Sequence, residues 1–392
     1  MIFSDYLPET DMNPDNPRIC YVVSSEITVA AFLREQIRHT GTRYDVTVAV
    51  NTANPEFLSA LGLTARLRSI AIVRQIALWQ DARALTALYR LFRRERFDLV
   101  HSVSPKAGLL AMLAGFLARV PVRIHTFTGQ VWVTRQGCAR GLLKLMDRLI
   151  ALFATHILVD SPSQRDFLLA QRVVSAEKSR VLGKGSISGV DASRFKPDPQ
   201  VRSGVRQQLG YRDNDVVFLF LGRLNRDKGV IDLAQAFARV AATAQNSRLL
   251  VIGPDEDGIQ SLLQAALGNA AARAQCITYT DRPQDYMAAA DVFCLPSYRE
   301  GFGTTIIEAA AAGIPAIGSR IYGVTDAIDD GITGLLFGPG DIGQLANAMA
   351  LLAGDTLLRH KLGEHARARA LRDFSAGLIT SELMRLYAAA IG

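Results

Sequence analysis

Short apolar runs alternate with amphipathic segments along most of the chain. The runs have the length and the β-branched content of buried strands, and the segments between them have helical spacing. In the first half the expected strands are 19–24, 44–50, 97–102, 122–127 and 156–160. The expected helices there are 29–39, 82–96, 106–118 and 141–153. Such alternation predicts a parallel sheet with helices on both faces.

The alternation is interrupted between residues 195 and 215, where Lys196-Pro197-Asp198-Pro199 precedes a short basic helix. It then restarts, with expected strands at 216–221, 248–252, 276–279, 292–296, 316–319 and 334–337 and a helix at 342–353. The predicted class is α/β, with two doubly wound Rossmann-like domains facing across a cleft. The predicted parts are a flexible leader (1–17), an N-terminal domain (18–200), a C-terminal domain (201–372) and a C-terminal helix (373–392) that packs back on the N-terminal domain.

The composition of the chain is consistent with two folded domains and indicates a reducing environment. With 392 residues, 49% of them hydrophobic and 21% charged, the chain can form two full cores and is not a disordered protein. Cys20, Cys138, Cys276 and Cys294 lack the spacing of a zinc site or a disulfide framework, so we expect core thiols in a reducing cytoplasm. The leader has no signal-peptide pattern, and the longest apolar run, 109–118, is about half a membrane span.

The net charge of +7 is concentrated in one region. Residues 82–150 carry 12 basic and 3 acidic side chains. Two groups stand out: Arg90, Arg93, Arg94 and Arg96 cluster on the helix expected at 82–96, and Arg135, Arg140, Lys144 and Arg148 edge the helix expected at 141–153. Basic residues beside an apolar stripe suit peripheral contact with the anionic inner face of the cytoplasmic membrane, and the alternative is a solvated basic face. No nucleic-acid-binding motif accompanies them, so nucleic acid is not an expected partner.

The densest candidate chemistry lies between Ser297 and Glu308. Glycines at 301 and 303 allow a tight turn, and the N–H groups of Gly303, Thr304 and Thr305 would open a helix that favours anions such as a diphosphate. Glu308, inside that helix, would accept hydrogen bonds from neighbouring sugar hydroxyls. The alternative is a buried helix with a carboxylate that caps its own start.

A second basic loop, Gly222 to Gly229, follows the first strand of the second half. Its Arg223 and Lys228 would meet the same diphosphate, or else are solvated cations. These two cations and a helix dipole would make a metal unnecessary. The Asp255-Glu256-Asp257 segment resembles a metal motif, but its place before a helix favours a dipole role. The glycine turn lacks the third glycine of a dinucleotide site, so NAD is not expected.

The combined motifs resemble the retaining glycosyltransferases of family 4, which have the GT-B fold. The matching segments are Gly222-Arg223 with Lys228-Gly229, Pro296-Ser297 with Glu300-Gly301-Phe302-Gly303, Glu308-Ala309, Ala312-Gly313 with Pro315, and the pre-linker segment 181–195. The resemblance covers the chain from about residue 19 onward and is more specific in the second half than in the first.

The resemblance implies roles for individual residues. The catalytic set would be His125, Glu300, Arg223 and Lys228, where His125 steadies the reacting sugar and is otherwise a structural histidine. The donor would contact Arg223, Lys228, Glu300, Gly301, Phe302, Gly303, Thr304, Thr305 and Glu308. The acceptor side would include Ser24, Ser25, Thr126 and Gly129. Ser24-Ser25 departs from the Gly-Gly turn of many relatives, so the acceptor side is expected to differ from theirs. The resemblance further implies that 18–200 is the acceptor-side domain and that 201–372 is the nucleotide-sugar-binding domain.

The function implied by the resemblance is transfer of a hexosyl or N-acetylhexosaminyl group, with retention, from a nucleotide-diphosphate sugar to a glycan or polyprenyl-diphosphate-linked acceptor. UDP is favoured by its frequency in the family, and no cofactor or metal is expected. The segment 125–132 looks like members that build O-antigen, capsule or exopolysaccharide. The alternatives are a nucleotide-sugar sensor or scaffold without catalysis, and an epimerase or phosphorylase on the same architecture.

Overall fold

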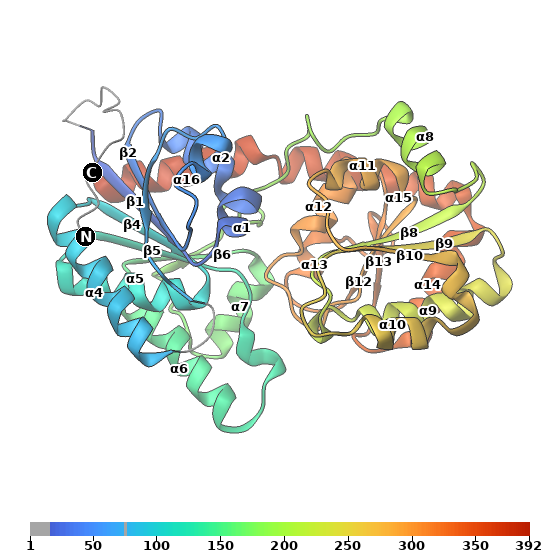
Figure 1. Cartoon of the computed structure of the whole chain (residues 1–392), viewed down its shortest axis with the longest axis horizontal. Coiled ribbons are helices and arrows are strands. Elements are labelled where there is room, and N and C mark those ends of the chain that lie inside the picture. The colour runs from blue at the N-terminus through green and yellow to red at the C-terminus, as the bar shows by residue number, and fades with distance from the viewer. Residues whose placement is uncertain (1–15, 74–76) are drawn as a thin grey trace. The chain divides into compact units, whose positions relative to one another are not determined.

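A computed structural model describes residues 16–73 and 77–392 and contains two parallel sheets flanked by helices (Figure 1). The first sheet has the strand order β3-β2-β1-β4-β5-β6-β7, and the second has the order β10-β9-β8-β11-β12-β13. In each sheet the chain starts at an inner strand, runs outward to one edge and then returns to continue on the other side. This confirms two doubly wound α/β sheets.

The strands of the first sheet are β1 (Arg18–Val23), β2 (Asp45–Val50), β3 (Arg66–Ser69), β4 (Leu99–Val103), β5 (Val122–Phe127), β6 (His156–Val159) and β7 (Ser179–Arg180). The strands of the second sheet are β8 (Val216–Leu221), β9 (Ser247–Ile252), β10 (Ala274–Ile277), β11 (Val292–Leu295), β12 (Ala316–Ser319) and β13 (Gly334–Phe337). In register, Ile19 of β1 pairs with Val46 of β2 and Leu99 of β4.

The helices up to residue 208 are α1 (Glu26–Thr28), the π-helical turn η1 (Val29–Leu33), α2 (Arg34–Thr40), α3 (Phe57–Ala60), α4 (Leu78–Glu95), α5 (Pro105–Ala118), η2 (Val131–Thr134), α6 (Gly137–Phe153), α7 (Pro162–Ala170) and α8 (Pro199–Gln208). The later helices are η3 (Arg226–Lys228), α9 (Val230–Thr243), α10 (Gln260–Leu267), η4 (Gly268–Arg273), α11 (Pro283–Ala289), α12 (Thr304–Ala311), α13 (Val324–Ala327), α14 (Ile342–Gly354), α15 (Thr356–Asp373) and α16 (Ala376–Ile391).

Packing divides the chain into two compact units. The first unit comprises Met1–Thr126, Met146–Ile157 and Leu383–Gly392, and the second unit comprises Phe127–Leu145 and Leu158–Glu382. The domain boundaries predicted from the sequence stay a prediction. The predicted leader lies, up to residue 15, outside the described residues.

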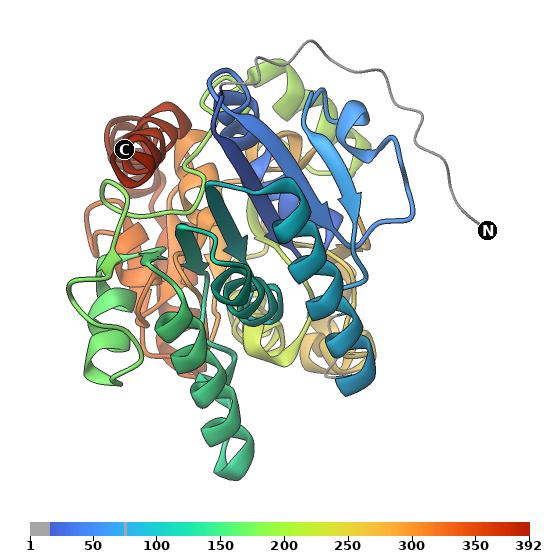
Figure 2. The same cartoon turned by 90° about the vertical axis from the view of Figure 1, so that its left-hand side faces the viewer.

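The first unit is built on β1, β2 and β4, whose side chains are nearly all buried. Helices α4 and α5 run side by side, as Figure 2 shows. The end of α16 also packs in this unit, where the hydroxyl of Tyr387 lies 3.0 Å from that of Tyr21 and 2.5 Å from Nδ1 of His101. The last helix is therefore fixed by a buried polar contact with the sheet as well as by apolar packing.

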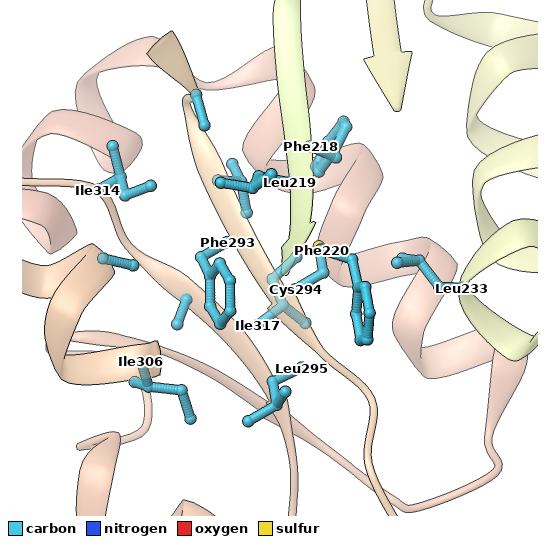
Figure 3. Close-up of a cluster of buried hydrophobic side chains, with 14 of the residues drawn as sticks. Phe218, Leu219, Phe220, Leu233, Phe293, Cys294, Leu295, Ile306, Ile314 and Ile317 are labelled. Carbon is cyan, nitrogen blue, oxygen red and sulfur yellow. The ribbon is translucent and has the colours of Figure 1, made fainter. Parts of the chain in front are cut away.

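The core of the second unit is formed by the two central strands and the helices on either face (Figure 3). Phe218, Leu219 and Phe220 of β8 are fully buried, as are Phe293 and Cys294 of β11. Strands buried on both faces read as continuous apolar runs, which is why the sequence identified them. The small residues 309–312 after Glu308 are also buried, and their helix, α12, packs closely against α15.

The structure corrects the sequence-based picture in two places. Strands β3 and β7 were not predicted, because Arg66–Ser69 is largely polar and half-buried and β7 has two residues. Among the cysteines, Cys138 is exposed at the start of α6 and is not a core thiol, whereas Cys20 and Cys294 are buried and Cys276 is half-buried. Within the described part of the chain, no helix combines the length and the apolar character needed to span a bilayer.

Candidate functional site

Two loops of the second unit meet at the carboxyl ends of β8 and β11. These strands are neighbours in the sheet, so the loop after each strand leaves from the same edge. The Tyr298 N–H donates to the Asp227 carbonyl at 2.8 Å, and the Arg299 guanidinium lies 3.0 Å from the Asp227 carboxylate. The basic loop 222–229 and the glycine turn 301–303 therefore belong to one local structure.

Lys228 and Glu300 form the centre of this structure. The Lys228 ammonium lies 2.5 Å from Oε1 of Glu300, and the Ser297 hydroxyl donates to the same oxygen at 2.7 Å. The two charged side chains are 18% and 13% exposed, so the pair is sheltered yet reachable. A cation and a carboxylate held at this distance present positive charge to an anion and a hydrogen-bond acceptor to a hydroxyl.

Arg223 has a different partner from the one its spacing suggested. Its guanidinium lies 2.9 Å from the Glu256 carboxylate, and the Asn225 amide donates to that carboxylate at 3.2 Å. Neighbouring Asp255 accepts the N–H groups of Ile259 and Gln260 at 2.9 and 3.0 Å, at the start of α10. Across residues 16–73 and 77–392, no three His, Cys, Asp or Glu side chains gather as a metal site would need.

The glycine turn leads directly into α12. Gly303 has φ +79°, a left-handed conformation that glycine adopts without strain, and no side chain of the described residues caps the helix. Thr304 and Thr305, the first helical residues, are half-buried. The start of α12 thus offers backbone N–H groups to an anion.

Two further predicted donor residues of this segment, Phe302 and Glu308, differ in their burial. Phe302 is 2% exposed, and its ring packs 5.1 Å from that of Phe374, so its side chain belongs to the core. Glu308 is half-buried, and burial raises the pKa of its carboxyl to about 7, while the Arg194 guanidinium acts against that rise. A carboxyl with this pKa is partly protonated and partly ionised near neutral pH.

The second unit also closes tightly around Gly301. A methyl group on Gly301 would lie 2.2 Å from the Thr128 carbonyl oxygen and 2.6 Å from Oδ2 of Asp160. The Ser161 hydroxyl donates to the Gly301 carbonyl at 3.1 Å. Gly129, predicted on the acceptor side, lies against the Glu300–Gly301 peptide. Only a residue without a side chain fits at position 301.

Asp160 is a site residue that sequence reasoning missed. It is 5% exposed, and burial raises its pKa well above the usual range, with the nearby Glu300 carboxylate adding to the rise. The available signal was its position, because it directly follows β6 and precedes the cap of α7, at the carboxyl end of a parallel strand.

In the first unit, His125 is fully buried on β5. The Ser102 hydroxyl lies 2.9 Å from Nδ1 of His125, and a methyl group on Gly108 of α5 would lie 2.3 Å from its Cε1. Burial lowers the pKa of His125 to about 3, and His101 contributes to that lowering. The imidazole is therefore neutral at pH 7, held between a hydroxyl and a helix that a glycine brings close.

The other first-unit candidates are held by local contacts. The Thr126 hydroxyl lies 2.7 Å from Nε2 of His101. The Ser24 hydroxyl lies 3.1 Å from that of Ser104, and the Ser25 hydroxyl lies 3.0 Å from that of Thr28. All of them, like His125, lie near the carboxyl ends of first-sheet strands. The two units thus each carry a set of candidate residues, a neutral one in the first and a charged one in the second.

Comparison with known proteins matches both halves of the chain to family models. Residues 201–369 match the model "Glycosyl transferases group 1", and residues 28–185 match the model "Glycosyl transferase 4-like domain". The capsular polysaccharide biosynthesis glycosyltransferase CapM of Staphylococcus aureus is 31% identical over 81% of this chain and 83% of its own length.

Two further similarities concern a curated relative and a solved structure. The Escherichia coli UDP-Gal:α-D-GlcNAc-diphosphoundecaprenol α-1,3-galactosyltransferase is 26% identical over 81% of each chain. The crystal structure of Anabaena HepE in complex with UDP-glucose is 20% identical, covers 95% of this chain and 99% of its own, and has a TM-score of 0.79.

Proposed function

The chain belongs to the glycosyltransferases of family 4, and we propose that it moves a hexosyl or N-acetylhexosaminyl group from a UDP-sugar to a hydroxyl of a bacterial glycan, with retention at the anomeric carbon. The observation that carries this proposal is the sheltered Lys228–Glu300 pair in the turn that opens α12. A cation and a helix start suit a diphosphate, and the adjoining carboxylate suits a sugar hydroxyl.

UDP is the proposed nucleotide because the Anabaena neighbour was crystallised with UDP-glucose. Lys228 and the start of α12 would meet the diphosphate, and Arg223 would turn to it from Glu256. In the helix that follows, Glu308 would accept hydrogen bonds from the ribose hydroxyls. These groups supply the positive charge that a metal ion would otherwise bring, so we propose that the reaction needs no metal cofactor.

In the proposed reaction, the bond between the anomeric carbon and the diphosphate oxygen breaks as negative charge builds on the diphosphate. The cations and backbone N–H groups stabilise that charge. The departing diphosphate oxygen takes the proton of the acceptor hydroxyl, and the acceptor oxygen forms its new bond to the anomeric carbon on the same face. No protein nucleophile is required. Neutral His125 would hydrogen-bond a hydroxyl of the transferred sugar.

The proposed acceptor is a lipid-linked glycan, because the Escherichia coli relative acts on a diphosphoundecaprenol-linked sugar by its name. Polysaccharide synthesis is the proposed process, since the relative with 31% identity is a capsular polysaccharide enzyme. Helix α6 supports peripheral contact with the inner face of the cytoplasmic membrane. Its Leu142, Leu145 and Leu152 are 55%, 49% and 64% exposed, beside exposed Arg140 and Arg148.

The first test is a thermal-shift panel of the purified protein with UDP-, GDP-, ADP- and TDP-sugars, without added metal. A selective shift with UDP-sugars is expected, and a shift with another nucleotide only would replace UDP in the proposal. Product analysis with lipid-linked acceptors then separates transfer from the alternatives. Binding without product would favour a sensor or scaffold, and a rearranged sugar without acceptor would favour an epimerase.

Membrane contact is tested by vesicle flotation. Reversing the charges of Arg93, Arg94, Lys144 and Arg148 to Glu is expected to release the protein from anionic vesicles, because each basic residue near such a surface contributes about 1 kcal/mol. Vesicles of neutral phosphatidylcholine serve as the control and should bind neither protein. If the variant floats with anionic vesicles as the wild type does, the residues form an ordinary solvated face.

A further inference from the structure

The second unit contains a buried polar chain that the proposed reaction does not use. It joins three residues, Gln130, Asp160 and Gln164, each at most 5% exposed, and Asp160 takes part through its backbone N–H. The Asp160 backbone N–H donates to the Gln164 amide oxygen at 3.0 Å, and the Gln164 amide nitrogen donates to the Gln130 amide oxygen at 3.1 Å. Gln164 uses both ends of its amide and so fixes the positions of the other two residues.

Each end of this chain carries a buried atom without a hydrogen-bond partner among residues 16–73 and 77–392. These atoms are Oδ1 of Asp160 and Nε2 of Gln130. Leaving such a group unpaired in a protein interior is unfavourable, so buried polar atoms without a partner are uncommon and call for an explanation. Here a carboxyl oxygen and an amide donor are left over in the same network.

The structural explanations for Asp160 fail one by one. The cap of α7 is Ser161, whose hydroxyl accepts the Gln164 N–H, so the Asp160 carboxyl does not cap the helix. None of the ion pairs of the described residues includes Asp160, and Lys228 pairs with Glu300. The Asp160 backbone is well used, because its carbonyl accepts the Ser186 N–H at 2.6 Å, which leaves the side chain as the unexplained part.

The place of Asp160 indicates what its side chain binds. Its Oδ2 lies 2.6 Å from the position that a methyl group on Gly301 would take, and Gly301 follows Glu300. Lys228 is already paired with Glu300, so a phosphate beside Asp160 would meet two carboxyl groups without an additional cation, whereas a neutral hydroxyl needs none. Burial beside Glu300 favours the protonated form of Asp160, which both donates and accepts hydrogen bonds as a hydroxyl partner must.

We propose that Asp160 and Gln130, positioned by Gln164, bind hydroxyl groups of the transferred sugar and thereby determine which hexose the enzyme accepts. This inference rests on the proposed function and adds to it a specificity set that lies outside the motifs of the second half. Unpaired polar groups reject a sugar that lacks the matching hydroxyl, because they then stay buried and unsatisfied.

The test compares UDP with UDP-glucose, UDP-galactose and UDP-N-acetylglucosamine on the wild type and on Asp160→Asn. The substitution keeps the shape and removes the acid. Calorimetry should give the same UDP affinity for both proteins within about twofold, because UDP carries no hexose. The sugar-dependent gain in affinity should fall by about tenfold, and the ratio of kcat/KM between glucose and galactose donors should change by at least that much, the scale of one lost hydroxyl contact.

Two further variants make the result decisive. Asp147→Asn removes another buried carboxyl, from α6, and should leave the donor ratio unchanged. Gln130→Met removes the amide donor at similar volume and supplies the same test if Asp160→Asn does not fold.

A donor ratio equal to that of the wild type in a folded variant overturns the inference, while UDP binding by the same variant upholds the proposed function. A change in the KM for the acceptor with an unchanged donor ratio also overturns the inference, because Asp160 or Gln130 would then bind hydroxyls of the acceptor and not of the transferred sugar. Absence of UDP-sugar binding in the wild type overturns both.

Discussion

The two units hold their candidate residues in opposite electrostatic states. In the first unit, His125 and His101 are buried among hydroxyl groups, and burial lowers the pKa of each imidazole to about 3. In the second unit, Lys228 pairs with Glu300 in a partly open turn, and burial raises the pKa of Glu308 to about 7. One unit therefore offers neutral hydrogen-bonding groups at pH 7, and the other offers charges and a carboxyl near its titration point.

This difference suggests a division of labour. A charged leaving group needs fixed cations and N–H groups, which the second unit supplies at the start of α12. A sugar hydroxyl can also be bound by a neutral group, and in the proposed reaction neutral His125 would be such a group. Substitutions of Lys228 and Glu308 in the second unit should therefore affect the binding or the departure of the nucleotide, and those around His125 should affect the transfer step alone.

The largest effect is expected for Lys228→Ala. Removing the cation leaves the developing diphosphate charge uncompensated, so kcat should fall by about 10²- to 10³-fold, the scale of about 2.7 to 4 kcal/mol for a lost group of this kind. Steady-state kinetics with the UDP-sugar measures this. Lys184→Ala is the matched control, since Lys184 is 66% exposed and pairs with Asp373 instead of with Glu300. A loss of less than tenfold would remove Lys228 from catalysis.

A smaller effect, on binding, is expected for Glu308→Ala. The variant should weaken UDP affinity by about 1 to 3 kcal/mol, because a charge-assisted hydrogen bond to the ribose is lost. Calorimetry with UDP alone isolates this contribution from any contact with the sugar. Unchanged affinity would show that Glu308 does not bind the ribose.

Gly108→Ala tests the role of His125 in the first unit. The new methyl group would lie 2.3 Å from Cε1 of His125, so the ring must shift, and we expect kcat to fall by about tenfold, or about 1.4 kcal/mol. UDP affinity should not change. Gly115→Ala on the same helix is the control, because its methyl group meets the flexible Arg123 side chain at 3.0 Å. If both variants retain full activity, the position of His125 does not matter for transfer.

The smallest effect concerns pH and stability. The folded-state pKa of Glu308 is raised, so its contribution to stability is present below about pH 4.5 and is lost as pH rises through about 7. Urea unfolding of wild type and Glu308→Gln between pH 4.5 and 7.5 should show this loss, on the order of 1 kcal/mol given partial exposure, in the wild type only. A constant difference between the two proteins would mean that the carboxyl does not titrate in this range.

The buried histidines should make folding stability change with pH in the opposite direction. Their folded-state pKa values are lowered, so the stability that they contribute is present above about pH 6.5 and is lost as pH falls toward 3. The Glu308→Gln variant should show the same loss of stability at low pH as the wild type. The two units would then be told apart in one pH series.

The sequence by itself determined the doubly wound class and most strands, because strands buried on both faces must be continuous apolar runs. It also identified the turn from Glu300 to Gly303 and the basic loop with Lys228, since a tight turn and an anion-binding helix start need particular residues at fixed spacing. Edge strand β3 was not predicted, because a polar, half-buried strand does not have to be a continuous apolar run.

The tertiary structure decided which side chains meet. Arg223 pairs with Glu256, 33 positions away, and Asp160 reaches Gly301 from a different strand, and no local pattern encodes either contact. It also decided the protonation states, because the same histidine or carboxyl has an ordinary pKa in an unfolded chain and a shifted one once packing removes water. Chemistry at fixed spacing is written in the sequence, whereas burial and long-range partners arise only when the chain has folded.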